Sequence, residues 1–193
     1  LNVYIRGAVA VGMAAVSDMV LCAACGDEQA LREVMASPNK HLSSVVKGGF
    51  THLFRNIMDN KDSSPVDINV ADCLLWASNG GHFGCVDLLL AHGANANAVN
   101  ENGSTALAMA SSIGHDGCVG LLLAHGANVN AVDKKGWTAL MAASSQGGHK
   151  GHDGCVSLLL AHGANVNAED KKGSTALKYA SHAGHDGCVG LLL

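Results

Sequence analysis

The feature that most constrains this chain is one stretch of sequence that recurs. The residues GHDGCVGLLLAHGANVNA at 114–131 return at 151–168 with Ser157 in place of a glycine, and the pattern begins again at Gly184. Four cysteines aligned on this pattern are 33, 37 and 33 residues apart, and the four extra residues at 147–150 account for the longer step. A period of this size is typical of stacked repeat units that bury their apolar faces against their neighbours. The four aligned cysteines are Cys85, Cys118, Cys155 and Cys188.

The composition suits a core built from small stacked units. Of the 193 residues, 48% are hydrophobic but only 4% are aromatic, and Ala, Leu and Val dominate the repeated stretch. The formal net charge of -4 comes without a clustered basic patch, which argues against a nucleic-acid-binding surface. No apolar run reaches the ~18 residues that a membrane-spanning helix needs, so no membrane segment is expected.

Each unit has the pattern of two short helices followed by a hairpin-like link. In residues 103–128, a threonine that can cap a helix precedes an Ala- and Leu-rich segment, and a glycine separates this segment from a second apolar one. Gly93, Gly126 and Gly163 fall where a helix should end in the left-handed conformation, which glycine adopts at little cost. The sequence therefore predicts an all-α fold of helix-turn-helix repeats with short hairpin links, stacked into a solenoid.

These units resemble ankyrin repeats. The stretches GWTALMAASSQ, GHDGCVSLLLAHGANVNAED and DKKGSTALKYA carry a Thr-x-Leu helix start, Gly-His between the helices, Val-x-Leu-Leu and Gly-Ala-Asn-Val-Asn, all within a 33-residue period. The resemblance implies an ankyrin-type solenoid. It covers 67–193 as four units, which are 67–99, 100–132, 133–169 and a truncated 170–193.

The rest of the chain is less regular. Residues 19–39 resemble a divergent first repeat with Gly26-Asp27 at the Gly-His position, 1–18 form an N-terminal segment, and 40–66 form an insert whose apolar spacing predicts one short helix. Val70 replaces the glycine of the hairpin in 67–71, so we expect the first finger to differ in shape. The last unit stops inside its second helix. We therefore expect either that the chain is a piece of a longer protein or that this open end packs on another surface, including self-association with a second copy.

The recurring His-x-x-Cys pattern raises the question of a metal site. Equivalent positions in stacked units lie about 8 to 10 Å apart, whereas zinc needs four ligands within about 2.3 Å and a disulfide needs Cα atoms within about 7 Å. We therefore interpret the cysteines as core residues. The histidines after the inter-helix glycine predict turn or capping contacts, and those before the helix-ending glycine can meet free helix carbonyls. The first set is His115, His152 and His185, and the second is His92, His125 and His162.

The other chemical motifs are weaker. His149-x-x-His152 beside Asp153 is the best metal candidate, echoed by His182-x-x-His185, but no third or fourth ligand is evident and loop solvation is the preferred interpretation. No nucleophile elbow, phosphate-binding loop or carboxylate pair occurs. The sequence therefore predicts no catalysis, no metal and no cofactor, and the Asn-rich NANAVNENG is interpreted as turn chemistry.

Cysteine usage bears on the compartment. Seven cysteines are an odd number, and four of them occupy one repeated position instead of a disulfide framework, which suits a reducing cytosol. Cys22-Ala-Ala-Cys25 matches a redox pattern but lacks the strand-turn context of such sites. The expected location is cytoplasmic, with the nucleus or a host-cell cytosol as alternatives.

The resemblance implies binding of a partner protein through the hairpin tips and the inner helix face. The matching positions are Glu101, Asn102, Ser104, Ser112 and Ile113 in the third unit, Lys134, Lys135, Trp137, Ser145 and Gln146 in the fourth, and Lys171, Lys172, Ser174 and His182 in the fifth. The two lysine pairs would stand on successive tips and offer four positive charges to an acidic partner, although solvated surface lysines are the default interpretation.

The two tryptophans receive different interpretations. Trp137 occupies a slot that holds Ser104 and Ser174 in the neighbouring units, so the stack does not require an indole there. It is either an exposed anchor for a partner or a residue that packs over the adjacent finger or the insertion at 147–150, and both interpretations stay open. Trp76 aligns with Met109 and Tyr179 and is predicted to lie in the core.

The sequence thus predicts a non-catalytic protein-interaction scaffold, an ankyrin array of about five units that binds a partner protein along its concave face. The alternative is the partner-recruiting segment of a larger enzyme or secreted effector whose catalytic domain lies outside this chain. A third hypothesis is a metal-binding protein that uses His149, His152 and cysteines.

Overall fold

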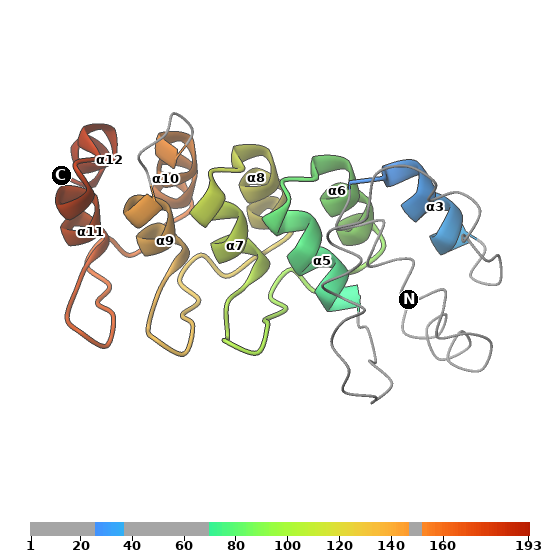
Figure 1. Ribbon diagram of the computed structural model, residues 1–193, viewed down its shortest axis with the longest axis horizontal. Coiled ribbons are helices and arrows are strands. Elements are labelled where there is room, and N and C mark those ends of the chain that lie inside the picture. Colours follow the sequence, from blue (N-terminus) through green and yellow to red (C-terminus); the bar gives the residue numbers. More distant parts are fainter. Residues whose placement is uncertain (1–25, 37–69, 147–151) are drawn as a thin grey trace, which may run out of the picture.

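The computed structural model describes residues 26–36, 70–146 and 152–193, which form a row of short helices with hairpin fingers on one side (Figure 1). The N-terminal segment 1–18 and the insert 40–66 lie outside these residues, as do Cys22, Cys25 and His149. The predictions made for those parts therefore stay predictions.

The helices form two layers. The first helices of the units pack side by side, and so do the second helices. The first helices are α5 (Val70–Asn79), α7 (Ala106–Ile113), α9 (Ala139–Gln146) and α11 (Ala176–Ala183). The second helices are α6 (Phe83–Ala91), α8 (Asp116–Ala124), α10 (His152–Ala161) and α12 (Asp186–Leu192), and α3 (Glu28–Ala36) packs against α6. Within the described residues there is one isolated β-bridge, between Val99 and Thr105, and no strand, so the all-α prediction is confirmed.

Threonine side chains start the first helices, as the sequence predicts. Oγ1 of Thr105 accepts a hydrogen bond from the backbone N–H of Ala108 at 3.1 Å, and Thr138 and Thr175 do the same for their own helices. Helix α5 differs, because Asp72 stands at the threonine position and the helix already begins at Val70. The last residues of the first finger are thus helical where the other units form a link.

Glycines end the second helices. Gly93, Gly126 and Gly163 have φ of 83°, 80° and 82°. The N–H of Gly126 donates to the carbonyl of Leu123, and the N–H of Ala127 donates to that of Leu122, which is the paired bonding of a Schellman motif. The predicted left-handed helix ends are confirmed.

The core runs along the row between the two layers. It consists of Ala, Leu, Val and Cys side chains together with Met141, and the four repeated cysteines are each at most 2% exposed, which confirms their assignment to the core. The prediction for Trp76 is wrong, because its side chain is 44% exposed. Its counterparts Met109 and Tyr179 are also only half-buried, so this position lies at the edge of the inner helix layer. None of the described helices is long and apolar enough to cross a membrane.

Candidate functional site

Side-chain hydrogen bonds fix the spacing between units. Asn97 of one unit donates from Nδ2 to the carbonyl of Gly126 in the next at 3.1 Å, and its Oδ1 accepts from the N–H of Asn128 at 2.7 Å. Asn130 makes the same two contacts with the following unit. Asn128 also accepts the N–H of Asn130 within its own turn, as expected for turn chemistry. The asparagine-rich link is therefore both a turn and a tie between neighbours.

The histidines after the inter-helix glycine form a second tie. Nε2 of His115 lies 3.2 Å from the carbonyl oxygen of Asn79, and Nδ1 of His185 lies 2.9 Å from that of Ser144. Neither histidine caps its own helix with its side chain. The predicted capping contact therefore exists, but it lies on the carboxyl end of the preceding unit's first helix. His152, one member of the candidate metal motif, is buried and makes the equivalent contact with the Ser112 carbonyl at 3.1 Å.

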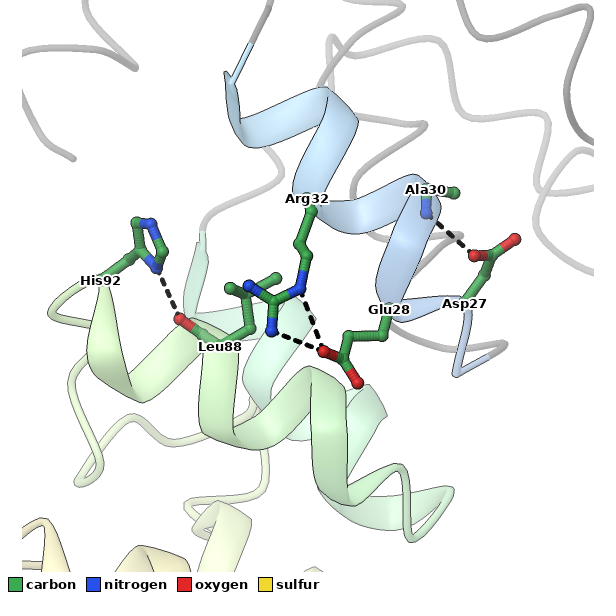
Figure 2. A network of polar contacts seen from close by, with 6 residues as sticks. All are labelled: Asp27, Glu28, Ala30, Arg32, Leu88 and His92. Carbon is green, nitrogen blue, oxygen red and sulfur yellow. Dashed lines mark hydrogen bonds and ion pairs between the residues drawn. The ribbon is translucent and has the colours of Figure 1, made fainter.

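Two histidines of the second set, His92 and His162, contact helix carbonyls as predicted. Nδ1 of His92 lies 2.8 Å from the carbonyl oxygen of Leu88, as Figure 2 shows, and His162 makes the same contact with Leu158 at 2.9 Å. Each of these carbonyls also accepts the main-chain N–H of the same histidine, so the imidazole adds a second contact at the helix end.

The cysteines add a third tie, which the sequence interpretation as plain core residues missed. Sγ of Cys155 donates to Oδ1 of Asp116 in the preceding unit at 2.8 Å, and Cys188 donates to Asp153 at 3.1 Å. The glycine before each cysteine makes room for this carboxylate, since a Cβ at Gly154 would overlap Oδ2 of Asp116. The recurring Asp-Gly-Cys is therefore one packing motif, in which the aspartate of one unit packs against the glycine and the cysteine of the next.

These thiols are held in the protonated form. Burial first, and then the hydrogen bond to the carboxylate, raises the pKa of Cys188 to about 12, and the same causes raise the pKa of Cys155. Because the thiolate is the nucleophile and the metal ligand, neither cysteine is prepared for those roles. Nowhere in 26–36, 70–146 or 152–193 do three or more His, Cys, Asp or Glu residues come together to hold a metal ion.

The surface carries a hollow of about 180 Å³ between the third and fourth units. Its walls come from the fingers and from the first helices α7 and α9. The lining is mostly small or apolar and includes Ala108, Met109, Val132, Trp137 and Ala142, with Ser112, Ser145 and Gln146 at the helix ends. Such a mixture of apolar walls and a few polar groups is typical of binding sites.

One small residue opens this hollow. Equivalent positions on the first helices hold Trp76, Met109, Ala142 and Tyr179, so three of the four units have a large side chain where the fourth unit has alanine. The hollow lies at Ala142, beside Met109. The position of the hollow therefore follows from Ala142, which is smaller than the residues at the equivalent positions of the other units. An alignment of the units shows this difference, but the sequence interpretation did not use it.

Trp137 forms one wall of the hollow and packs against the next unit. Its ring centroid lies 4.9 Å from that of Tyr179 on α11, with the two planes tilted by 51°. The indole is half-buried. The indole thus packs against the neighbouring unit through the ring of Tyr179 on its first helix, and a role as partner anchor stays a prediction.

The fingertips are tied to one another by main-chain hydrogen bonds. The N–H of Lys134 donates to the carbonyl of Asn102 at 3.0 Å, and that of Lys171 donates to the carbonyl of Lys135 at 3.1 Å. The two lysine pairs are exposed and stand on neighbouring tips. In the part of the chain that the structure describes, the one ion pair joins Arg32 to Glu28 on α3 (Figure 2), so the fingertip ammonium groups have no carboxylate partner there.

The carboxylates near these lysines serve the fingers themselves. Oδ1 of Asp133 accepts the N–H groups of Lys135 and Trp137, and Asp170 accepts those of Lys172 and Ser174. Oδ2 of Asp170 also accepts the Tyr179 hydroxyl at 2.6 Å. The Tyr179 hydroxyl and the main-chain N–H groups lower the pKa of Asp170 to about 2, and the same bond raises the pKa of Tyr179.

The other predicted binding positions fall into two groups. Ser104, Ser145 and Gln146 line the hollow. Glu101, Asn102 and His182 are exposed, the first two on the tip of the third finger and the last on α11. Ser174 is buried, so its hydroxyl is not offered to a partner.

Comparison with curated proteins finds no significant match. A family model described as ankyrin repeats, three copies, matches residues 19–133, 74–170 and 114–193, which together reach from 19 to the last residue. The helix pairs, fingers and inter-unit contacts described above lie within this range. The chain belongs to the ankyrin-repeat family.

Proposed function

We propose that this chain is a non-catalytic scaffold that holds a segment of a partner protein across the hollow at Ala142 and the tips of the neighbouring fingers. Ankyrin repeats are in general protein-protein interaction modules, and the family is typically non-catalytic. The observation that carries the proposal is the hollow, because it combines a partly apolar lining with fingers that are joined by main-chain hydrogen bonds. A surface that is already ordered loses little conformational entropy on binding.

The partner-binding residues proposed from the sequence surround this hollow or extend from it. Trp137, Ser104, Ser145 and Gln146 would contact the partner at the hollow. The residues that would contact the partner beyond the hollow, on the fingertips and on α11, are Glu101, Asn102, Lys134, Lys135, Lys171, Lys172 and His182.

The test fills the hollow without disturbing the stack. Ala142→Met introduces a side chain that the equivalent position in the third unit, Met109, already carries, so the fold should tolerate it. Gly120→Ala on α8 is the control, because a Cβ there meets no atom within 4 Å. Trp137→Ala is less suitable, since it also removes the contact with Tyr179.

Photo-crosslinking from Gln146, on the rim of the hollow, reports partner proteins in a cell lysate. We expect crosslinked proteins that are lost with Ala142→Met and retained with Gly120→Ala. Crosslinking that is unchanged by Ala142→Met would refute the hollow as the binding site.

A further inference from the structure

We infer that the partner segment which this groove recognises is an extended acidic peptide with one apolar side chain, the apolar residue lying in the hollow and the acidic residues lying along the fourth and fifth fingertips. This inference rests on the proposed function and adds the chemistry of the partner.

The hollow sets the apolar part. Its volume of about 180 Å³ exceeds the roughly 150 Å³ of cavities that accept a benzene ring, so one side chain up to the size of Phe fits. The lining includes Ala108, Met109, Val132, Trp137 and Ala142, and its charged residue is Asp133, whose Oδ1 already accepts two main-chain N–H groups. An acidic anchor would be repelled by this carboxylate, and a basic anchor would find it already hydrogen-bonded, which favours an uncharged, apolar anchor.

The fingertips set the charge. Lys134, Lys135, Lys171 and Lys172 are exposed on two tips that are hydrogen-bonded to each other. Two carboxylates next to these lysines in the sequence, Asp133 and Asp170, accept main-chain N–H groups of their own fingers, and Asp170 is buried. The ammonium groups therefore project outward, while two of the neighbouring negative charges are held inward.

The charge pattern also gives the peptide a direction. The tip of the third finger carries Glu101 where the fourth and fifth tips carry lysines. On the fifth finger the two exposed lysines outnumber the one exposed glutamate, Glu169. An acidic segment is repelled by Glu101 and attracted by the two following tips. The acidic part should therefore extend from the hollow toward the fifth unit and away from the third.

The spacing of the stack predicts the spacing of the acidic residues. Stacked units lie about 10 Å apart, and a chain in the extended polyproline II conformation advances about 3.1 Å per residue with about three residues per turn. Acidic residues three positions apart would therefore lie on the same side of the peptide and reach successive tips. A peptide is favoured over a nucleic acid because the chain has a formal net charge of -4 and the carboxylate of Asp133 lines the hollow, and both would repel a phosphate backbone.

The experiment is selection from a phage-displayed library of random peptides of about 12 residues, a length that spans up to about 40 Å. The full chain is the bait, and peptides that also bind Ala142→Met are removed. We expect the remaining peptides to be acidic, with one apolar residue at a constant distance from Asp or Glu residues spaced by three. Synthetic fluorescent copies should bind about tenfold or more weakly to Ala142→Met, measured by anisotropy.

A matched pair of variants tests the charge. Lys134→Gln with Lys135→Gln removes two positive charges from the tip, and Ala124→Glu with Ser157→Glu adds two negative charges at exposed positions of the outer helices α8 and α10. Both change the net charge by the same amount. We expect the fingertip pair to weaken binding about tenfold and the outer pair to leave it nearly unchanged, with the difference shrinking as NaCl rises from about 50 to about 500 mM.

The outcomes separate the two proposals. Selected peptides that depend on Ala142 but have no acidic bias would overturn the acidic partner and leave the hollow as a binding site. Acidic peptides that bind Ala142→Met equally well, or the recovery of no peptides, would overturn this inference. Displacement by a single-stranded oligonucleotide that binds Ala142→Met unchanged would assign the lysines to nucleic acid and also overturn it.

Discussion

Three buried serines offer a prediction of increased stability. Ser78, Ser111 and Ser144 occupy the same position of α5, α7 and α9, each is 0% exposed, and none of their hydroxyls has a hydrogen-bond partner. We expect Ser111→Ala to stabilise the protein, although it removes a polar group that three units share.

The magnitude follows from two contributions. An unsatisfied buried polar group costs about 1 to 3 kcal/mol, and alanine is the better helix former by roughly 0.5 kcal/mol. Loss of the packing contacts of one oxygen atom offsets part of this gain. We expect the free energy of unfolding to rise by about 1 to 2 kcal/mol, and the midpoint of thermal unfolding by about 2 to 8 °C for a chain of this length.

The chain contains its own control. Ser181 holds the equivalent position on α11, where it is exposed to solvent, so Ser181→Ala changes helix propensity without removing a buried hydroxyl. Guanidinium unfolding followed by circular dichroism measures both variants against the parent chain. We expect the gain for Ser111→Ala to exceed that for Ser181→Ala by about 1 kcal/mol.

A gain at Ser111 no larger than that at Ser181 would refute the reasoning. It would mean that the buried hydroxyl does find a partner, for example a carbonyl one turn earlier in its own helix. A loss of stability with an unchanged circular dichroism spectrum would lead to the same conclusion.

Three further predictions concern the ties within and between units. The low pKa of Asp170 implies stability that is fully present above the ordinary carboxyl pKa of about 4 and is lost as the pH falls through about 2. Asp170→Asn should therefore flatten the dependence of the unfolding free energy on pH between about 4 and about 2, and the chain should tolerate it because Asn100 makes the same turn in the third finger. Among the helix glycines, Gly120→Ala should raise stability by up to about 1 kcal/mol, whereas Gly154→Ala should lower it because its Cβ meets a carboxylate; equal effects in chemical unfolding would contradict this packing account. The Cys155 thiol should resist iodoacetamide at pH values near 8 until the protein unfolds, as measured by mass spectrometry of its peptide; rapid labelling of the folded chain would disprove the protonated, buried thiol.

The candidate site was only partly predictable from the sequence. The fingertip lysines could be found by aligning the tips, and their side-by-side placement follows from the repeat period. A search for chemically distinctive residues could not find the hollow, because the residue that opens it is Ala142, the smallest side chain among the equivalent positions of the four first helices. The equivalent positions also explain the wrong prediction for Trp76, since Met109 and Tyr179 are only half-buried there and it is the small Ala142 that is buried.

The sequence by itself determined what happens within one unit. A threonine before an apolar run and a glycine after it specify where helices begin and end, because both signals act between residues close together in the chain. The tertiary structure decided what happens between units. The bond from Cys155 to Asp116, the contact of His185 with the preceding helix and the packing of Trp137 on Tyr179 join residues more than 30 positions apart. Such contacts depend on how two surfaces fit when they are stacked, and no local pattern records that fit.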